Sequence, residues 1–149
     1  MSSTSTKIIV AGASGFVGKN LRNFLYEKKL SALAISRKNF HKHPSEIKII
    51  TTNLSDPKLQ SKLKNYDALI NLIGIGRQTP KSTFEEINLN LTKDVIKTCK
   101  NAGIKKIIFI SGLGVSKNNT SNYFVSKYKA EQEIINSGLD YTIFRASYI

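Results

Sequence analysis

The chain has 149 residues, of which 40% are hydrophobic and 22% are charged, and it carries a formal net charge of +13. A chain of this length fits one domain with a real core, since it buries about 70% of its unfolded surface. No run of about 18 apolar residues is present, which argues against a membrane-spanning segment. The single cysteine, Cys99, excludes an intrachain disulfide and a thiolate metal cluster and is expected to fill the core.

The positive charge is spread along the chain, and no stretch combines a basic stripe with aromatic residues. This pattern predicts a solvated lysine-rich surface that attracts an anionic cofactor, and no nucleic-acid partner. Residues 1–6 are polar and lack the apolar stretch of a secretory signal, so we expect a disordered tail and a cytoplasmic protein. His41 and His43 have no third ligand at a recognisable spacing, so no metal site is expected.

Six short apolar runs punctuate the chain and are nearly continuous rather than alternating. Such runs are typical of strands covered on both faces of a sheet. The predicted strands span residues 7–11, 32–35, 47–50, 68–73, 106–110 and 141–144.

Helical patterns separate most of these runs. In residues 84–102 the apolar positions fall on one stripe, and Gly103 suits a left-handed C-cap. Asp56 and Pro57 are typical of an N-cap and a first helical residue. The predicted helices span residues 15–29, 58–65, 84–102 and 122–136, and the predicted loops span 38–45, 74–82 and 112–121. Alternating strands and helices predict an α/β fold, a Rossmann-type doubly wound parallel sheet in three αβα layers, forming one domain over residues 7–149.

A glycine turn follows the first predicted strand and opens the first helix. Gly12 permits a tight turn, Gly15 lets the backbone approach a pyrophosphate, and Gly18 lets the helix pack closely on the strand. The helix N-terminus then offers free amides to the phosphates. The sequence therefore predicts a nicotinamide dinucleotide held by the whole turn: Gly12, Ala13, Ser14, Gly15, Phe16, Val17 and Gly18.

The end of the second predicted strand bears on which nicotinamide dinucleotide binds. An NAD-preferring site often has an acidic residue here, whereas this chain has Ser36, Arg37 and Lys38. A guanidinium can stack on adenine and pair with a 2′-phosphate. The segment therefore favours NADP(H) over NAD(H), with Arg37 and Lys38 as contacts.

Several further motifs occur in a fixed order, and with them the chain resembles the extended and atypical branch of the short-chain dehydrogenase/reductase superfamily. The resemblance is to epimerase-like proteins related to the nucleotide-binding accessory subunit of respiratory complex I, and it runs from about Lys7 to Ile149. Beyond the glycine turn it rests on Asn53-Leu54-Ser55-Asp56, Asn71-Leu72-Ile73-Gly74, Phe84-Glu85-Glu86-Ile87-Asn88, Ile110-Ser111-Gly112-Leu113-Gly114-Val115, Tyr123-Phe124-Val125-Ser126-Lys127 and Phe144-Arg145-Ala146-Ser147-Tyr148-Ile149.

The resemblance implies roles for specific residues. Asn53 and Leu54 would pass the adenine, and the Leu72, Ile73 and Gly74 backbone would lie along the cofactor. The reactive pair would be Tyr123 as general acid/base and Lys127, which would tune it and hold the nicotinamide ribose. Residues four apart share a helix face, and a nearby cation favours ionisation of a phenol. Asn88 is a further cofactor-side residue, expected to matter more for loop structure than for chemistry.

The serine or threonine that polarises the substrate oxygen in this family has no direct counterpart. Gly112 occupies the usual position, and Ser111 is the nearest candidate, with Ser116 or no donor at all as alternatives. A shift of one residue in a strand turns the side chain to the other face. In the predicted helix over residues 122–136, Glu131 and Glu133 follow Lys127 and Lys129 at helical spacing, which predicts surface ion pairs.

The family normally continues into a region that closes over the substrate, so we expect a fragment or a minimal form with an open pocket. The resemblance implies an oxidoreductase or epimerase-like domain acting on an unknown small molecule, with a non-catalytic NADP(H)-binding accessory or regulatory subunit as the alternative. The superfamily often pairs through helices matching residues 84–102 and 122–136, which makes a homodimer an option. Nucleic-acid binding through the positive charge is a third alternative, with steeply salt-dependent affinity.

Overall fold

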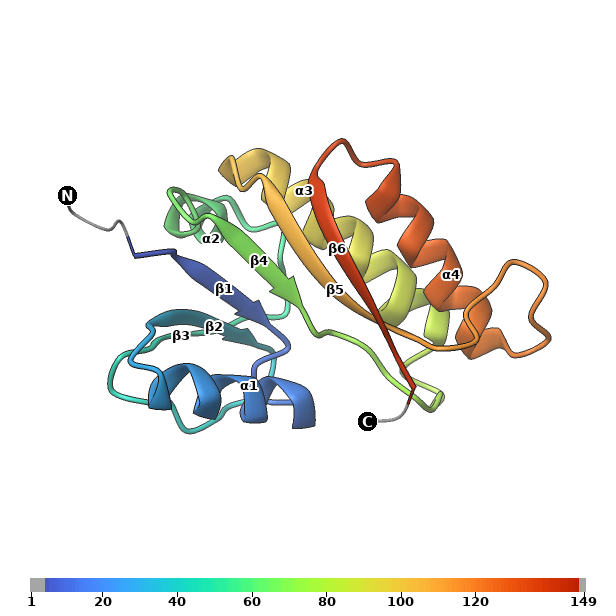
Figure 1. The fold of residues 1–149 in the computed structure, drawn as a ribbon, viewed down its shortest axis with the longest axis horizontal. Coiled ribbons are helices and arrows are strands. Elements are labelled where there is room, and N and C mark those ends of the chain that lie inside the picture. The colour runs from blue at the N-terminus through green and yellow to red at the C-terminus, as the bar shows by residue number, and fades with distance from the viewer. Residues whose placement is uncertain (1–4, 148–149) are drawn as a thin grey trace.

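The computed structural model describes residues 5–147 and contains one six-stranded parallel sheet with the order β3-β2-β1-β4-β5-β6 (Figure 1). The strands are β1 (Ile8–Ala11), β2 (Ala32–Ser36), β3 (Ile47–Ile50), β4 (Ala68–Asn71), β5 (Lys106–Gly112) and β6 (Asp140–Ala146). The helices are α1 (Phe16–Glu27), α2 (Pro57–Lys62), the π-helical turn η1 (Glu85–Asn90), α3 (Leu91–Ala102) and α4 (Asn122–Ile135). The predicted Rossmann-type fold is confirmed.

The strand order places a topological switch in the middle of the sheet. From β1 the chain winds outward through β2 to β3, then returns to β4 on the other side of β1 and continues to β6. Loops leaving the carboxyl ends of β1 and β4 therefore diverge, and in open α/β sheets ligands bind in the crevice between such loops. The glycine turn leaves β1, and the segment starting at Leu72 leaves β4.

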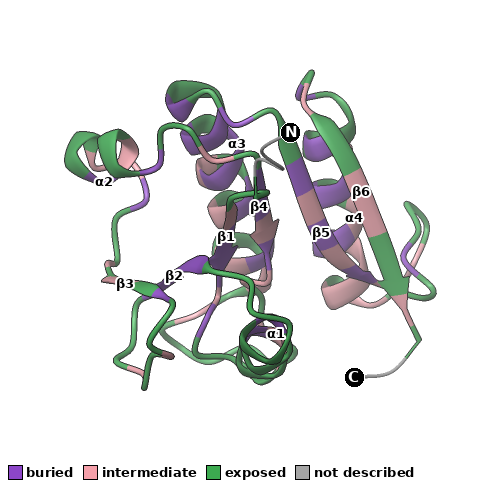
Figure 2. Ribbon diagram, turned by 60° about the vertical axis from the view of Figure 1, so that its left-hand side comes forward, coloured by how far each residue is buried: buried purple, intermediate pink, exposed green. Residues whose placement is uncertain are grey.

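Two apolar clusters form the core, one on each face of the sheet. The larger joins β-strand residues such as Leu33 and Phe109 to α2, α3 and α4, and the smaller joins Val10 and Ala34 to Leu25 of α1. Figure 2 shows buried residues concentrated in the central strands and on the sheet-facing sides of α3 and α4. On its face of the sheet, α1 covers only the region of β1 and β2. Phe144 of β6, at the far edge of the sheet, is not covered by α1 and remains 55% exposed.

The six predicted strands all form; three ends differ from the prediction by two residues, and the starts of β1 and β6 and the end of β2 differ by one. The strand predicted to reach Ile73 stops at Asn71, because the Asn71 side chain accepts a hydrogen bond from the Ile73 amide (3.1 Å) and turns the chain. β5 continues to Gly112, which was predicted to begin a loop, and β6 extends to Ala146. These two strands stay paired to their ends, with Gly112 opposite Ala146.

The predicted helices also form. Asp56 caps α2 by accepting a hydrogen bond from the Lys58 amide, and Pro57 occupies its first turn, as predicted. α2 ends at Lys62, earlier than the predicted residue 65. Gly103 closes α3 with φ +75°, confirming the predicted left-handed cap. The predicted helix over 84–102 is continuous but begins with the π-helical turn η1.

Two expectations concern the chain as a whole. The predicted polar tail falls largely on residues 1–4, which lie outside the described residues, so the boundary at residue 7 stays a prediction. Within residues 5–147, no helix is long and apolar enough to cross a membrane.

Cys99 is fully buried, and burial raises the pKa of its thiol to about 12, as suits a core residue.

Candidate cofactor and active site

The glycine turn has the geometry that its spacing predicts. Gly12 has φ +88°, and a Cβ atom there would lie 2.8 Å from the carbonyl carbon of Leu72. A Cβ atom on Gly18 would collide with the carbonyl oxygen of Gly12, which confirms the close approach of α1 to the turn. A Cβ atom on Gly15 would meet only the Gly12 oxygen, at 3.4 Å. Two of the three glycines are thus required by the protein's own packing.

The start of α1 presents backbone amides that have no partner within the part of the chain that the structure describes. Gly12 and Ala13 both donate to the carbonyl of Ile35 at 3.0 Å, which fastens the turn to β2. The Phe16, Val17 and Gly18 amides make no hydrogen bond among the described residues, and no side chain caps this helix end. Unpaired amides at a helix N-terminus attract anions. The arrangement fits the diphosphate of a dinucleotide.

A pocket of about 210 Å³ lies beside this turn. Its lining comes from four places: the start of α1, the loop after β4, the end of β5 and the helix α4. The lining residues are Val17, Leu72, Ile73, Gly74, Ile75, Gly76, Ile110, Ser111, Tyr123 and Lys127. The structure therefore brings the three predicted reactive residues, Ser111, Tyr123 and Lys127, to one pocket, together with the predicted cofactor-side segment Leu72 to Gly74.

Asn88 supports the wall of this pocket from behind. Its side chain is fully buried, accepts a hydrogen bond from the Ile75 amide (2.9 Å) and donates to the Ile75 carbonyl and to the Ser126 hydroxyl, at 3.2 Å each. Its Oδ1 would lie 3.3 Å from a Cβ atom on Gly74. Asn88 thus holds the loop after β4, the structural role that the sequence predicted for it.

Lys127 is buried although it carries an amine. Its Nζ donates to the Ile110 carbonyl at 2.8 Å and lies 4.4 Å from the centre of the Phe109 ring. Burial lowers the pKa of Lys127 to about 8, and the nearby Glu131 carboxylate offsets only part of this effect. The Lys127 amine therefore has a lower affinity for its proton than an exposed lysine amine.

This shift predicts a pH-dependent stability. Lys127 titrates near pH 8 when folded and near 10.5 when unfolded, so between these values the unfolded chain binds more protons and stability rises with pH. We expect the stability advantage of Lys127→Met over the unsubstituted chain to shrink by up to about 3 kcal/mol from pH 7.5 to 10.5. Urea unfolding of both proteins across this range measures the difference, in which the other lysines cancel. A pH-independent difference would contradict the shift.

Ser111 lies in the pocket, and Ser116 does not. In β5 the buried positions alternate, so Ser111 shares a face with Ile107 and Phe109. Its hydroxyl is the one buried side-chain oxygen or nitrogen in the described part of the chain that lacks a hydrogen-bond partner. A buried hydroxyl without a partner is costly, which suits a group that meets a ligand. Ser116 is exposed in the following loop.

Gly112 faces an aromatic ring instead of the pocket. A Cβ atom on Gly112 would lie 3.3 Å from the Phe124 ring. The same ring packs edge-on against Tyr123, with centroids 5.2 Å apart, and Phe84 also packs edge-on against Tyr123 at 5.6 Å. The two rings fix where the Tyr123 phenol lies. A side chain at position 112 would require the Phe124 ring to shift by a few tenths of an ångström.

The remaining predicted cofactor contacts lie away from this pocket. Arg37 and Lys38 are exposed just after β2, and the Ser36 hydroxyl beneath them bonds to the Ser14 hydroxyl (2.6 Å) and accepts from the Lys38 amide (3.1 Å). Asn53 is exposed after β3, at the same edge of the sheet. Leu54 is buried, with its side chain in the larger core cluster, and its carbonyl accepts a hydrogen bond from Thr98 (2.9 Å).

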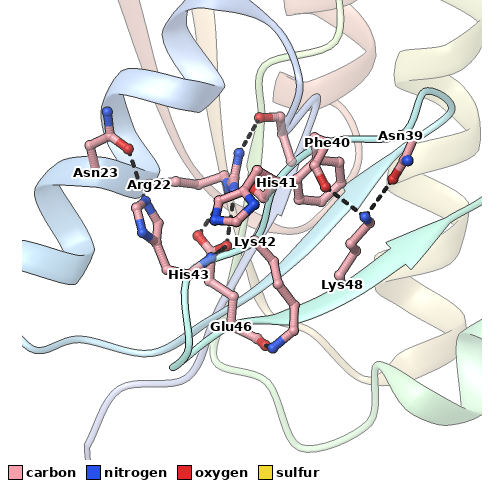
Figure 3. Close-up of polar contacts among 10 residues, drawn as sticks. Arg22, Asn23, Asn39, Phe40, His41, Lys42, His43, Glu46 and Lys48 are labelled. Atoms are coloured by element: carbon pink, nitrogen blue, oxygen red, sulfur yellow. Dashed lines mark hydrogen bonds and ion pairs between the residues drawn. The ribbon is translucent and has the colours of Figure 1, made fainter.

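A buried ion pair that the sequence did not suggest lies behind the glycine turn. Arg22 of α1 and Glu46, just before β3, are 3% and 6% exposed and make two hydrogen bonds of 2.9 Å (Figure 3). Burial opposes ionisation of Glu46, but hydrogen bonds from Arg22 and the His43 amide, with the nearby charges, outweigh it and lower its pKa. The two residues are 24 positions apart, so no local sequence pattern predicts that they pair.

The predicted surface ion pairs on α4 are wrong. Glu131 is 1% exposed and binds Arg145 of β6 with two hydrogen bonds, of 2.6 and 3.0 Å, while Lys127 turns to the Ile110 carbonyl. Glu133 lies 3.7 Å from Lys93 of α3 rather than pairing with Lys129. The side of α4 that carries Lys127 and Glu131 faces the sheet, which turns a predicted surface pair into buried groups.

A Rossmann sheet whose glycine turn offers free amides beside a pocket of Ser, Tyr and Lys defines a nicotinamide dinucleotide-binding protein. Residues 12–149 match the model of a family described as NAD(P)H-binding, and the chain belongs to that family. It is 30% identical to UPF0659 protein YMR090W of Saccharomyces cerevisiae over 93% of this chain and 68% of the yeast protein. It is 27% identical to the mitochondrial NADH dehydrogenase [ubiquinone] 1 alpha subcomplex subunit 9 of Arabidopsis thaliana over 91% of this chain and 36% of that subunit.

Solved structures show the same architecture. A protein from Bacillus halodurans, provisionally named an NAD-dependent epimerase/dehydratase, superposes with a TM-score of 0.77 at 28% identity over 95% of this chain and 70% of its own. A UDP-glucuronic acid 4-epimerase from Bacillus cereus in complex with NAD superposes at 0.76 and 21% identity, over 94% and 55%. The chain therefore spans 70% and 55% of these two solved chains. The predicted resemblance is confirmed: this is an NAD(P)-binding, epimerase/dehydratase-like domain.

Proposed function

We propose that this chain is the cofactor-binding and catalytic part of an NADP(H)-dependent oxidoreductase or epimerase-like enzyme. The observation that carries the proposal is the convergence of Ser111, Tyr123 and Lys127 on one pocket beside the glycine turn. The Ser111 hydroxyl has no hydrogen-bond partner among residues 5–147, and burial lowers the pKa of the Lys127 amine to about 8, which are properties expected of groups that act on a substrate.

The chain's own residues supply binding, orientation and proton transfer. The unpaired amides at the start of α1 hold the diphosphate, and the segment from Leu72 to Gly74 lies along the cofactor. The nicotinamide, when bound, supplies hydride transfer. Tyr123 gives a proton to the substrate oxygen or takes one from it, Ser111 donates a hydrogen bond to the same oxygen, and Lys127 stabilises the phenolate and holds the ribose.

The preference for NADP(H) rests on the residues after β2. Arg37 and Lys38 are exposed cations, and residues 36–38 contain no carboxylate that would repel a 2′-phosphate. The backbone beneath them is held by Ser36, whose hydroxyl accepts from the Lys38 amide. A planar guanidinium on this fixed segment can pair with a phosphate through two hydrogen bonds.

Parallel titrations with NADPH and NADH test both parts of the proposal. We expect NADPH to bind at least about tenfold more tightly, a difference of about 1.4 kcal/mol, and Arg37→Ala to remove most of that preference. Arg77→Ala, which removes an exposed arginine from the loop after β4, is the control and should leave the NADPH preference in place. Equal affinities for the two cofactors would contradict NADP(H) specificity, and no binding at millimolar concentration would contradict the function.

A second candidate is a non-catalytic accessory or regulatory subunit that binds NADP(H). The packing of Phe124 against Gly112 favours the accessory subunit. The position that carries the hydroxyl in the family is a glycine here, and the Phe124 ring lies against it. The two candidates differ in turnover: NADPH-dependent reduction of any carbonyl compound supports the enzyme, and tight binding without turnover of a broad panel supports the subunit.

The surroundings of the domain are also proposals. A cytoplasmic location remains a proposal, and the plant relative is mitochondrial by name. A homodimer paired through η1, α3 and α4 is the expected assembly if the chain associates, and the partners expected are a nicotinamide dinucleotide and a small-molecule substrate rather than nucleic acid.

A further inference from the structure

The Arg22–Glu46 pair connects two segments that the proposed cofactor site uses separately. Arg22 donates from Nη1 to the Ala13 carbonyl (3.0 Å), inside the glycine turn, and from Nη2 to the His41 carbonyl (2.6 Å), in the loop after β2. Its remaining hydrogen bonds are the two to the Glu46 carboxylate. One guanidinium therefore ties the turn to the loop (Figure 3).

Glu46 and Phe40 secure the same loop. Glu46 accepts a further hydrogen bond from the His43 amide at 2.8 Å, and the Phe40 ring lies 4.4 Å from the guanidinium carbon of Arg22. Lys48 donates to the Phe40 carbonyl at 2.6 Å. The far part of the loop, residues 40–46, is thus fastened to α1 and β3 (Figure 3).

The near end of the loop has its own anchor. The Ser36 hydroxyl lies 2.6 Å from the hydroxyl of Ser14 in the glycine turn and accepts from the Lys38 amide. The backbone is therefore held at Ser36, before Arg37 and Lys38, and again at His41, after them. Two independent links to the glycine turn enclose the two cations.

Stability alone is a poor reason for a buried ion pair. Removing two charges from water costs free energy that their attraction only partly offsets, and apolar residues of similar volume often serve a fold as well. A buried pair that uses four of the five guanidinium N–H donors instead specifies one arrangement of the groups it bridges. Here those groups are the carbonyls of Ala13 and His41.

We propose that Arg22 and Glu46 are positioning residues for cofactor specificity, holding the loop of residues 37–46 against the glycine turn so that Arg37 and Lys38 meet the 2′-phosphate of a dinucleotide bound there. This inference rests on the proposed NADP(H) function. A loop held in its bound conformation binds more tightly, since less conformational freedom is lost on binding. The effect falls on the dinucleotide that reaches the loop, so it sets the ratio of NADPH to NADH affinity.

The test replaces the pair with apolar residues of similar size, Arg22→Met with Glu46→Leu, and measures dissociation constants for both cofactors. We expect the preference for NADPH to fall about tenfold or more, while NADH affinity changes less than about threefold. Glu46→Gln, which keeps the shape but offers one acceptor oxygen in place of two, should change the preference in the same direction and serves if the double variant does not fold. The control is Lys93→Met with Glu133→Leu, a half-exposed pair between α3 and α4, which should leave the ratio unchanged.

Adding Arg37→Ala distinguishes positioning from a general structural effect. If the pair acts through Arg37, the loss of preference in Arg37→Ala and in the double variant will not add when combined. Full additivity, or an equal weakening of NADPH and NADH, would overturn the inference while leaving the proposed function in place. If the unsubstituted protein binds neither cofactor, the proposed function fails, and the inference fails with it.

Discussion

Gly12→Ala is expected to weaken NADPH binding about 100-fold or more, which corresponds to about 2.7 kcal/mol. The new Cβ atom would lie 2.8 Å from the Leu72 carbonyl carbon, and the backbone at Gly12 has φ +88°, where side chains are strained. Relief requires β1 and the segment after β4 to move apart at the switch point. That movement displaces the amides at the start of α1, which we propose hold the diphosphate. Isothermal titration calorimetry with NADPH measures the change.

Gly103→Ala provides the matched control. Gly103 also has a positive φ, +75°, but apart from its chain neighbours no described residue has an atom within 4 Å of the position its Cβ would occupy, and it closes α3 at the opposite end of the sheet. The variant should lose about 1 kcal/mol of stability through backbone strain and bind NADPH normally. Equal affinity losses in the two variants would show that the cofactor does not depend on the glycine turn.

Tyr123→Phe is expected to lower turnover by about 10²- to 10⁴-fold, the range typical of a lost general acid/base, with NADPH affinity nearly unchanged. Phenylalanine keeps the edge-on packing against Phe84 and Phe124 and removes only the hydroxyl. The measurement is the oxidation of NADPH with a panel of carbonyl compounds, together with direct titration of the cofactor.

Tyr128→Phe controls for the loss of a hydroxyl from α4. Tyr128 is half-buried on the same helix and does not line the pocket, so its variant should retain full turnover. Unchanged turnover in Tyr123→Phe would remove this tyrosine from the mechanism. Should the unsubstituted protein bind NADPH without reducing any carbonyl compound on the panel, the accessory-subunit alternative gains support and the enzymatic proposal loses it.

Of the candidate catalytic residues, the sequence predicted the positions of Tyr123 and Lys127 but not that of the serine. Tyr123 and Lys127 stand four residues apart, so a helix alone places them on one face, and both line the pocket. The choice among Ser111, Ser116 and no donor stayed open, because it depends on which face of β5 meets α4. Pairing with β6 extends β5 to Gly112 and directs Ser111 into the pocket.

The predicted charge pairs were wrong for the same reason: local spacing does not show which side of a helix is buried. Glu131 follows Lys127 at the spacing of a surface ion pair, and nothing in the local sequence indicates that this side of α4 is buried. In the structure Glu131 finds Arg145 and Lys127 finds a carbonyl, because the strands β5 and β6 lie beneath the helix. Which partner a charged side chain takes is decided by the elements that pack against its own.

The amino-acid sequence by itself determined the alternation of strands and helices, the glycine turn and the family, since apolar periodicity and the need for glycine at a tight turn are properties of neighbouring residues. Only the tertiary structure decided that Ser111 faces the pocket, that Phe124 fills the space beside Gly112, and that Arg22 and Glu46 meet. These contacts join segments distant in the chain, and their energies depend on burial. Burial arises only when the sheet and its helices assemble.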